Sequence, residues 1–524
     1  MSIKRINVLC AAIFSAFLIS SCTTKPTSNI AVDVLITSTN VLVGDGSEAR
    51  ALDIGICQEK ICAVLPKGQH QFLAKKVIDA GDKLVSPGFI DPHTHSLAEL
   101  ENPETAANLN YLTQGVTTVV NGNDGGDIVD IASIKDKLNQ QGIGTNTALL
   151  VGHGSVREHV MGRSERQATA DELAAMKALV NKAMLDGAIG LSTGLYYVPG
   201  SYASTEEVIE LARIASNYDG IYDTHLRDES TFNIGFTQAV DEAIDIVKAA
   251  NIHLHLAHIK ALGVDVWGQS SAVIDKVNRA RENGVSISAD QYPWQASGTH
   301  LHSAVVPKWV MADSQQAFVN RLNDLSLRPK IMAQITENIR RRGGADALLF
   351  TVANDESIVG KTLKDVAQER GLNASELVIE LVQGAPIRVA SFNMSADDIR
   401  QFMQQPWVVT SSDGTNGHPR KYASFPKKYR QYVLEESVLT LPQFVMQSSY
   451  KTAQAIKLPE RGLLTNGFFA DIIIVDLKKY KDKASFSDWN VLSEGVETVI
   501  VNGSIVIENS QFTNILAGRV LTKK

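Results

Sequence analysis

Histidines and acidic residues lie at the C-terminal ends of several apolar stretches of this chain. The stretch LVSPGFIDPHTHS, residues 84–96, begins apolar and ends with Asp91, His93 and His95 at alternate positions. Alternate side chains of a β-strand point to the same face, so this spacing predicts that the three side chains share one side. Two imidazoles that leave one face of a strand can bind one metal ion. The stretch is therefore a candidate metal site.

Three later stretches end in the same way. GIYDTHLRDES ends a predicted strand at His225, NIHLHLAHIKALG ends one at His258, and PWVVTSSDG ends one at Asp413. The chain thus offers two early histidines, one histidine in each of two middle strands and a late aspartate. This donor set is typical of a hydrolytic metal centre.

Alternation within NIHLHLAHIKALG divides its polar residues between two faces. His258 shares a face with Lys260, whereas His253 and His255 lie on the opposite face. We therefore expect His258 to be the ligand, and His253 and His255 to be packed or bridged by solvent.

The elements that carry these residues alternate along the chain. An apolar strand, a loop and an amphipathic helix recur over nearly 400 residues, which predicts a parallel sheet covered by helices. One helix is expected to begin at Thr169, with Glu172 completing a capping box, and another at Ser204 with Glu207 as its partner. The length favours a (β/α)8 barrel over an open sheet, so chemistry is expected at the carboxyl ends of the strands.

Both ends of the chain have a different pattern, with short apolar runs separated by turns. Asn502-Gly503, between two β-branched runs, predicts a hairpin. We therefore predict an α/β protein in which a (β/α)8 barrel is joined to a small β-sandwich domain built from both termini. The predicted boundaries are 1–21 for a lipoprotein signal peptide, 22–31 for a tether, 32–84 and 459–524 for the β-domain, and 85–458 for the barrel, with a helical insertion at about 300–350.

Composition excludes several classes of protein. The 524 residues carry 50 basic and 57 acidic side chains, a formal net charge of -7 without a basic stripe, which argues against nucleic-acid binding. Of the four cysteines, Cys10 lies in the predicted signal peptide and Cys22 is the candidate for lipidation, so only Cys57 and Cys62 remain, which excludes a disulfide framework. A turn at Gln58-Glu59 would pair Cys57 with Lys60 and leave the sulfurs of Cys57 and Cys62 diagonal. Two packed thiols are therefore favoured over a disulfide.

The N-terminus has the features of a bacterial lipoprotein signal. Lys4 and Arg5 precede an apolar run that is too short to span a bilayer, and small residues precede Cys22. We expect lipidation of Cys22, which would anchor the protein in a membrane of the cell envelope. Because Thr23 rather than aspartate follows, analogy with lipoprotein sorting favours the outer membrane, facing the periplasm.

Beyond these features, the order HxH, His, His, Asp on a predicted barrel resembles the amidohydrolase superfamily. More specifically, successive segments over essentially the whole mature chain resemble the D-aminoacylase, or N-acyl-D-amino-acid deacylase, family. These segments are SPGFIDPHTH, GVTTVVNGNDGG, GHGSVREHVMG, GAIGLSTGLYYVPGSYASTEE, YDTHLRDES, AHIKALG, DQYPWQASGT, SSDGTNGHPRKYASFPKKY and RGLLTNGFFADIIIVD.

The resemblance implies roles for individual residues. It implies that His225 and His258 hold a tightly bound zinc ion, that His93 and His95 belong to a second, weaker metal position, and that Asp413 transfers protons. It also implies that the substrate, an N-acyl amino acid, contacts four further residues, namely Tyr197, Lys260, Ser297 and Arg420. Lys260 and Arg420 suit the α-carboxylate. Lys260 could instead form a salt bridge at the barrel mouth, and Arg420 could be a solvated loop charge.

The sequence departs from the family pattern at the end of the second strand. Where the family often has a metal-binding cysteine after GN, this chain has Asp124. A carboxylate can also bridge two divalent ions, so we expect Asp124 to be a ligand rather than only a cap of the following loop. Asp91 is better interpreted as a partner of a ligating imidazole than as a ligand. Gly194 and Gly200 are expected to be turn residues that let Tyr197 approach the site.

These residues predict a zinc-dependent amidohydrolase that cleaves N-acyl-D-amino acids to a carboxylic acid and a D-amino acid. Two alternatives stay open. One is hydrolysis of a cyclic amide, as in dihydroorotase-like or hydantoinase-like enzymes, or of an isoaspartyl dipeptide. The other is a non-catalytic envelope lipoprotein that binds acyl amino acids, which the presence of Asp413 disfavours because binding needs no proton transfer.

Overall fold

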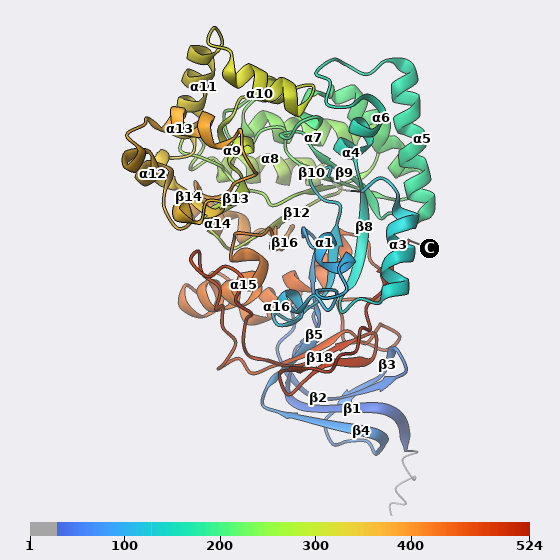
Figure 1. Cartoon of the computed structure of the whole chain (residues 1–524). Helices are drawn as coiled ribbons and strands as arrows, with labels where there is room; N and C mark the ends of the chain where they lie inside the picture. The colour runs from blue at the N-terminus through green and yellow to red at the C-terminus, as the bar shows by residue number, and fades with distance from the viewer. Residues whose placement is uncertain (1–28, 127, 524) are drawn as a thin grey trace, which may run out of the picture.

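The computed structural model describes residues 29–126 and 128–523, which form a barrel of parallel strands joined to a smaller β-sheet domain (Figure 1). The eight barrel strands lie in the order β16-β12-β11-β10-β9-β8-β7-β6. A bridge between Thr94 and Gly414 brings the two end strands together. The predicted (β/α)8 fold is confirmed. The strands are β6 (Phe89–Asp91), β7 (Val116–Asn121), β8 (Asn146–Gly152), β9 (Gly190–Gly194), β10 (Ile221–His225), β11 (His253–Leu256), β12 (Ile287–Gln291) and β16 (Val408–Thr410).

Helices cover the outside of the barrel (Figure 1). α5 begins after Thr169, which forms the predicted capping box with Glu172. α6 begins after Ser204, which accepts a hydrogen bond from the backbone of Glu207. The helices are α1 (Leu97–Glu101), α2 (Leu109–Leu112), α3 (Ile131–Gln141), α4 (His153–Met161), α5 (Ala170–Asp186), α6 (Thr205–Ser216), α7 (Phe236–Ala250), α8 (Ser270–Glu282), α14 (Ala396–Met403), α15 (Arg420–Lys427), α16 (Leu441–Ser448) and α17 (Tyr450–Ala455).

The two faces of the barrel strands belong to different apolar cores. One face packs against the helices. The other face contributes Ile90, Val120, Leu150 and Ile221 to a separate cluster, which also contains Ala453 of α17. This cluster fills the inside of the barrel, so polar side chains remain for the carboxyl ends of the strands.

Strands from both ends of the chain share one sheet, ordered β20-β19-β18-β17-β5-β1-β2-β3, with β4 paired to β1. The strand β5 joins the two halves, because it pairs with β1 and with β17. The predicted hairpin at Asn502-Gly503 connects β18 and β19. The strands are β1 (Ile30–Val41), β2 (Arg50–Cys57), β3 (Lys60–Pro66), β4 (Phe72–Gly81), β5 (Leu84–Pro87), β17 (Ile472–Val475), β18 (Val496–Val501), β19 (Ser504–Glu508) and β20 (Gln511–Phe512).

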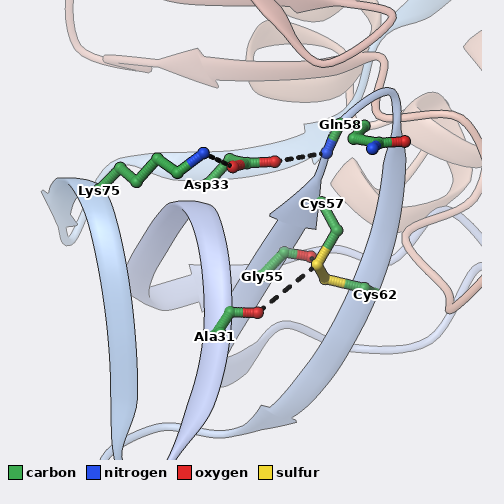
Figure 2. The surroundings of a disulfide bond; sticks show 7 residues. All are labelled: Ala31, Asp33, Gly55, Cys57, Gln58, Cys62 and Lys75. Carbon is green, nitrogen blue, oxygen red and sulfur yellow. Dashed lines mark hydrogen bonds and ion pairs between the residues drawn. A yellow bond between two sulfur atoms is a disulfide. The ribbon is translucent and has the colours of Figure 1, made fainter.

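Cys57 and Cys62 form a disulfide bond (Figure 2), so the preference for two free thiols was wrong. Cys57 does pair with Lys60, as the turn predicts. The next pair, Ile56 with Ile61, keeps this register, but the register then shifts, so that Gly55 pairs with Ala63. Cys62 is therefore the extra residue of a β-bulge, and a bulge re-aims a side chain that regular pairing would leave diagonal.

The insertion between β12 and β16 is larger than predicted and is not purely helical. The segments expected to be helical do form helices, but a three-stranded antiparallel sheet, ordered β13-β15-β14, accompanies them. The insertion also has an apolar core of its own. Its elements are β13 (Ala296–His300), α9 (Leu301–Val305), α10 (Gln315–Asn323), α11 (Arg328–Arg341), β14 (Leu348–Val352), α12 (Leu363–Arg370), α13 (Ala374–Leu381) and β15 (Arg388–Phe392).

The predicted signal peptide and Cys22 lie outside the described residues. Within residues 29–126 and 128–523, no helix is long and apolar enough to cross a membrane.

Candidate metal centre and active site

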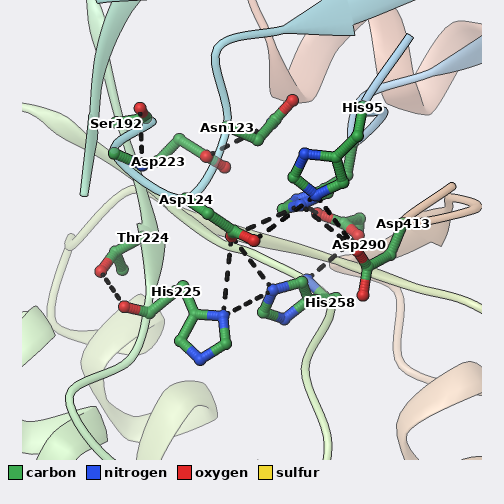
Figure 3. A network of polar contacts seen from close by, with 12 residues as sticks. His95, Asn123, Asp124, Ser192, Asp223, Thr224, His225, His258, Asp290 and Asp413 are labelled. Carbon is green, nitrogen blue, oxygen red and sulfur yellow. Dashed lines mark hydrogen bonds and ion pairs between the residues drawn. The ribbon is translucent and has the colours of Figure 1, made fainter. Parts of the chain in front are cut away.

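Four imidazoles converge on the carboxylate of Asp124, and Figure 3 shows three of them, those of His95, His225 and His258. Its Oδ1 atom lies 3.2 Å from Nε2 of His258, 3.4 Å from Nε2 of His93 and 3.6 Å from Nδ1 of His225. Its Oδ2 atom lies 3.5 Å from Nε2 of His95. The structure therefore brings together all five residues for which metal binding was predicted.

These donors form two groups that could each hold a metal ion. One group is Asp124, His225 and His258, and the other is His93, His95, Asp124 and Asp413. Asp124 is common to both groups. A carboxylate offers two oxygens, so Asp124 could contact an ion in each group. Asp124 is therefore placed to take part in either group.

The chemistry of the donors fits a bound divalent ion. Both ring nitrogens of His93 are buried and have no hydrogen-bond partner among the described residues. Nδ1 of His225 and Nε2 of His258 face each other at 2.9 Å. Burial opposes the ionisation of Asp124, but the charges of His93 and His258 hold the pKa of that carboxyl well below its usual range. A carboxylate anion beside imidazole nitrogens is a ligand set that zinc prefers.

Three residues of the site have left-handed backbone conformations. The φ angles are 58° at Asp124, 33° at His258 and 48° at Asp413. Non-glycine residues rarely adopt these angles, and such residues cluster at functional sites. His258 lies two residues beyond β11, which ends at Leu256. The direction of the His258 side chain is therefore set by the conformation of the loop after β11 and not by strand alternation.

Asp91 does not contact a ligating imidazole, so that expectation was wrong. Ile90 belongs to the cluster inside the barrel, and Asp91 follows it on the opposite face of β6. Its Oδ1 atom accepts hydrogen bonds from the backbone N–H groups of His93, at 3.2 Å, and Ser412, at 3.1 Å. Burial raises the pKa of Asp91 to about 8. Asp91 therefore ties the end of β6 to the loop that carries Asp413.

Asp290, at the end of β12, faces a ligating imidazole that Asp91 does not contact. Its Oδ1 atom accepts a hydrogen bond from the backbone N–H of His258 at 3.1 Å, and its Oδ2 atom lies 3.9 Å from Nδ1 of His93. His255 holds the same carboxylate at 3.0 Å. His255 is therefore a buried, packed histidine, as expected. The stretch VSISADQ, an apolar strand closed by an acid, could have identified Asp290.

Glu229 lies behind two of the imidazoles, and the sequence reasoning missed it. Its Oε1 atom is 3.3 Å from Nδ1 of His258, and its Oε2 atom is 3.6 Å from Nε2 of His225. Lys260 pairs with Glu229 at 2.6 Å and lies 2.8 Å from Nδ1 of His258. Burial opposes ionisation of Glu229, but Lys260 lowers its pKa to about 2. Glu229 therefore fixes the orientation of both rings.

Asp413 is held by Arg420. The Nη1 atom of Arg420 lies 2.7 Å from Oδ2 of Asp413, and both side chains are buried. The other carboxylate oxygen, Oδ1, faces His95 at 3.4 Å and His93 at 3.8 Å. Burial would raise the pKa of Asp413, but the Arg420 guanidinium outweighs it and holds that pKa well below the usual range. Asp413 is therefore an anion with one oxygen directed toward the metal ligands.

A cavity of about 530 Å³ opens above the donors. Tyr197, Lys260 and Ser297 line it, as expected for substrate contacts. Arg420 does not line it, because its guanidinium is turned to Asp413, Gly298 and Thr415. The structure therefore gives Arg420 a positioning role toward Asp413 in place of direct contact with the cavity.

Tyr197 stands beside the donors, with its ring centre 4.7 Å from that of His225. Burial, followed by the charge of Asp124, raises its pKa well above the usual value, so the phenol keeps its proton. Gly194 begins the expected turn, because its carbonyl oxygen accepts a hydrogen bond from the backbone N–H of Tyr197 at 3.0 Å, although its φ is not left-handed. A Cβ atom at this position would lie 2.1 Å from the carbonyl oxygen of Asp124. Glycine is required because two backbones approach closely.

A buried ion cluster connects α4 and α6 close to this loop. Glu207 accepts from His153 at 2.8 Å and pairs with Arg157. The carboxylate is therefore not available to complete a capping box with Ser204. Because Gly154, Ser155 and Glu158 of α4 line the cavity, this cluster fixes one of its walls.

The site combines a metal-binding donor set, an anionic proton acceptor and a phenol that can donate a hydrogen bond. A divalent ion supplies Lewis acidity and activates water, and a carboxylate can accept the proton of that water. This combination suits hydrolysis of a carbonyl compound.

Comparison with known proteins gives the same class. The family model described as amidohydrolase family matches residues 76–507. The D-aminoacylase of Alcaligenes xylosoxydans xylosoxydans is 28% identical, over 94% of this chain and 98% of its own length. The N-acyl-D-glutamate deacylase of the same organism is 29% identical, over 94% and 97%.

Solved structures agree. A crystal structure of D-aminoacylase superposes with a TM-score of 0.80 at 29% identity, covering 94% of this chain and all of that chain. The N-acyl-D-glutamate deacylase of Bordetella bronchiseptica, complexed with zinc and a phosphonate inhibitor, gives a TM-score of 0.81 at 28% identity over the same shares. An L-hydantoinase of Arthrobacter aurescens, at 15% identity and a TM-score of 0.53, shares the fold.

Proposed function

The chain belongs to the amidohydrolase family, and from this premise we propose that it hydrolyses N-acyl-D-amino acids to a carboxylic acid and a free D-amino acid. The observation that carries the proposal is Asp413, an anion with one oxygen held by Arg420 and the other turned toward the metal ligands. A linear amide needs a group that accepts the proton of the attacking water and returns it to the departing nitrogen. Asp413 meets both requirements.

The chain's own residues divide the reaction between them. When bound between His93, His95, Asp124, His225 and His258, a divalent ion supplies an activated water and polarises the carbonyl group. Asp413 takes the proton of the water, and Arg420 keeps the carboxylate oriented for this step. Asp413 then delivers the proton to the amine. Tyr197 keeps its phenolic proton and can donate a hydrogen bond to the oxygen that gains negative charge.

We further propose zinc as the metal, with one tight position and one weaker position. D-aminoacylase and the glutamate deacylase are relatives with a binuclear metal centre and bound zinc, respectively. The group of His225, His258 and Asp124 is mostly histidine, which suits zinc. The other group contains two carboxylates and is more permissive toward manganese or cobalt.

The test is amide cleavage by the purified protein, loaded with zinc, on matched N-acetyl-D- and N-acetyl-L-amino acids, with dihydroorotate as a cyclic control. We expect amine release from the D series only. Cleavage of dihydroorotate alone would refute the proposal in favour of a cyclic-amide hydrolase. Bound metal without cleavage of any substrate would favour the non-catalytic binding protein.

We also propose that the protein is a lipoprotein of the cell envelope, anchored through Cys22 in the outer membrane and facing the periplasm. The support is the N-terminal sequence: basic residues, a short apolar run and Cys22 after small residues. Growth with labelled palmitate should label the wild-type protein and leave Cys22→Ala unlabelled. Equal labelling of both would disprove lipidation at this residue.

A further inference from the structure

Four cationic side chains line the cavity, and their partners differ. Lys260 is 2.6 Å from Oε1 of Glu229, and Lys421 pairs with Glu99. Each of these two lysines is therefore neutralised by a carboxylate of the protein. The other two cations are Arg342 and Arg388, both from the insertion between β12 and β16.

Arg342 is already occupied by neighbouring groups of the protein. Its Nε atom donates to the carbonyl oxygen of Ala304 at 2.8 Å, and Nη2 lies 3.4 Å from the hydroxyl of Tyr196. Its guanidinium lies 5.5 Å from the ring centre of Phe232, a cation–π distance. Arg342 therefore supports the wall of the cavity.

Arg388 has no such partners. Among residues 29–126 and 128–523, no carboxylate lies within 4.0 Å of its guanidinium, and its buried Nε atom has no hydrogen-bond partner. Its hydrogen bond is from Nη1 to Nε2 of His300, at 3.2 Å. Burial lowers the pKa of Arg388 to about 10, so the group remains charged at neutral pH. A half-buried guanidinium with free donors is a site for an anion of the ligand.

The sheet of the insertion shows where this anion would lie. Gly298 of β13 accepts a hydrogen bond from Arg420, the residue that holds Asp413. His300, two residues farther along β13, is the register partner of Arg388. Two strand residues span about 7 Å. Arg388 lies on the Asp413 side of the cavity, because its charge interacts with those of Arg420 and Asp413 and its strand partner is two residues from Gly298. In the proposed reaction Asp413 returns the proton to the departing nitrogen, so this is the side of the amine half.

We propose that Arg388 is a specificity-determining residue that binds the side-chain carboxylate of the substrate, so that the preferred substrates are N-acyl derivatives of acidic D-amino acids. This inference rests on the proposed deacylase function. Sequence identity does not distinguish the substrate class, because the D-aminoacylase and the N-acyl-D-glutamate deacylase are 28% and 29% identical to this chain. The unpaired guanidinium of Arg388 is the feature that favours an acidic side chain on the substrate.

The test compares three substrates with the zinc-loaded full-length enzyme: N-acetyl-D-glutamate, its neutral isostere N-acetyl-D-glutamine, and N-acetyl-D-leucine. We expect kcat/KM for the glutamate derivative to exceed that for glutamine by roughly 100-fold, because a buried charged pair is lost in the isostere. Arg388→Gln should bring the ratio of the two kcat/KM values close to one, because it should lower kcat/KM for the glutamate derivative alone. Arg370→Gln is the matched control, since Arg370 lies on the same insertion and pairs with Asp355 and Glu380 at the surface.

Two results would overturn the proposal. Equal kcat/KM for glutamate and glutamine derivatives in the wild type would show that no side-chain carboxylate is recognised. An equal loss on all three substrates in Arg388→Gln would show that Arg388 binds the α-carboxylate instead. In both cases the D-amides are still cleaved by the wild type, so the proposed function stands. Failure to cleave any of the three in the wild type would refute the deacylase function itself.

Arg388→Lys provides a second variant that keeps the charge. We expect it to retain part of the glutamate preference, because an ammonium group can pair with a carboxylate but not through a planar fork. A loss of preference as complete as in Arg388→Gln, with unchanged thermal unfolding in both variants, would contradict a charge-based role.

Discussion

Replacement of Asp124 by alanine is expected to weaken both metal positions together. Asp124 belongs to both donor groups, so its loss reduces one group from three donors to two and the other from four to three. Zinc bound by four protein ligands is worth about 10–16 kcal/mol, or about 3 kcal/mol per ligand. Loss of one ligand should therefore raise the Kd for zinc roughly 100-fold at each position.

The assay is zinc content of wild type and Asp124→Ala across a series of buffered free-zinc concentrations. We expect both binding steps to shift to higher free zinc in the variant. Asp91→Asn is the control, because Asp91 lies two residues from His93 and its carboxylate accepts hydrogen bonds from the backbone N–H groups of His93 and Ser412 without facing a ligating nitrogen. A shift of one binding step alone would refute bridging by Asp124, and no shift at all would refute its role as a ligand.

Three further predictions concern catalysis and stability. Asp413→Asn should abolish amide cleavage while bound zinc stays near the wild-type level; full activity would refute the proton-transfer role. Burial lowers the pKa of Lys428 to about 7, so above pH 7 the folded protein binds fewer protons than the unfolded chain, whose lysine titrates near 10.4. Its free energy of unfolding should rise by up to about 1.4 kcal/mol per pH unit between pH 7 and 10 relative to Lys428→Met, measured by urea unfolding; parallel curves would disprove this. Glu207→Gln leaves the buried Arg157 without a counter-charge and should lower the free energy of unfolding by about 3–5 kcal/mol; a change below about 1 kcal/mol would contradict that.

The proposed substrate selectivity depends on features that sequence identity between relatives does not reveal. Arg388 is one arginine among many in the sequence, and neither strand alternation nor a motif marks it. It stands out only because the structure places it in the cavity without a carboxylate partner. Likewise, only the structure shows that the guanidinium of Arg420 pairs with Asp413 and does not line the cavity.

The sequence alone determined those features that depend on neighbouring residues. The capping box of α5 and the hairpin at Asn502-Gly503 follow from local backbone chemistry, and both are present. Polar residues at the ends of apolar strands can also be identified from the sequence. Because a parallel barrel brings the carboxyl ends of its strands together at one face, such residues are expected to lie close to one another. His225 and Asp413 could therefore be placed in the site before any coordinates were known.

The tertiary structure decided whatever depends on loops, bulges and burial. His258 lies beyond the end of β11 with a left-handed φ, so strand alternation could not give its direction. A β-bulge brings Cys62 to Cys57, and a register shift of this kind has no local sequence signature here. Asp290 faces the imidazole of His93 and Glu229 faces that of His258, at distances set by the packing of strands far apart in the chain. The distances between side chains on distant strands result from many weak packing contacts. The spacing of residues along the sequence therefore does not predict them.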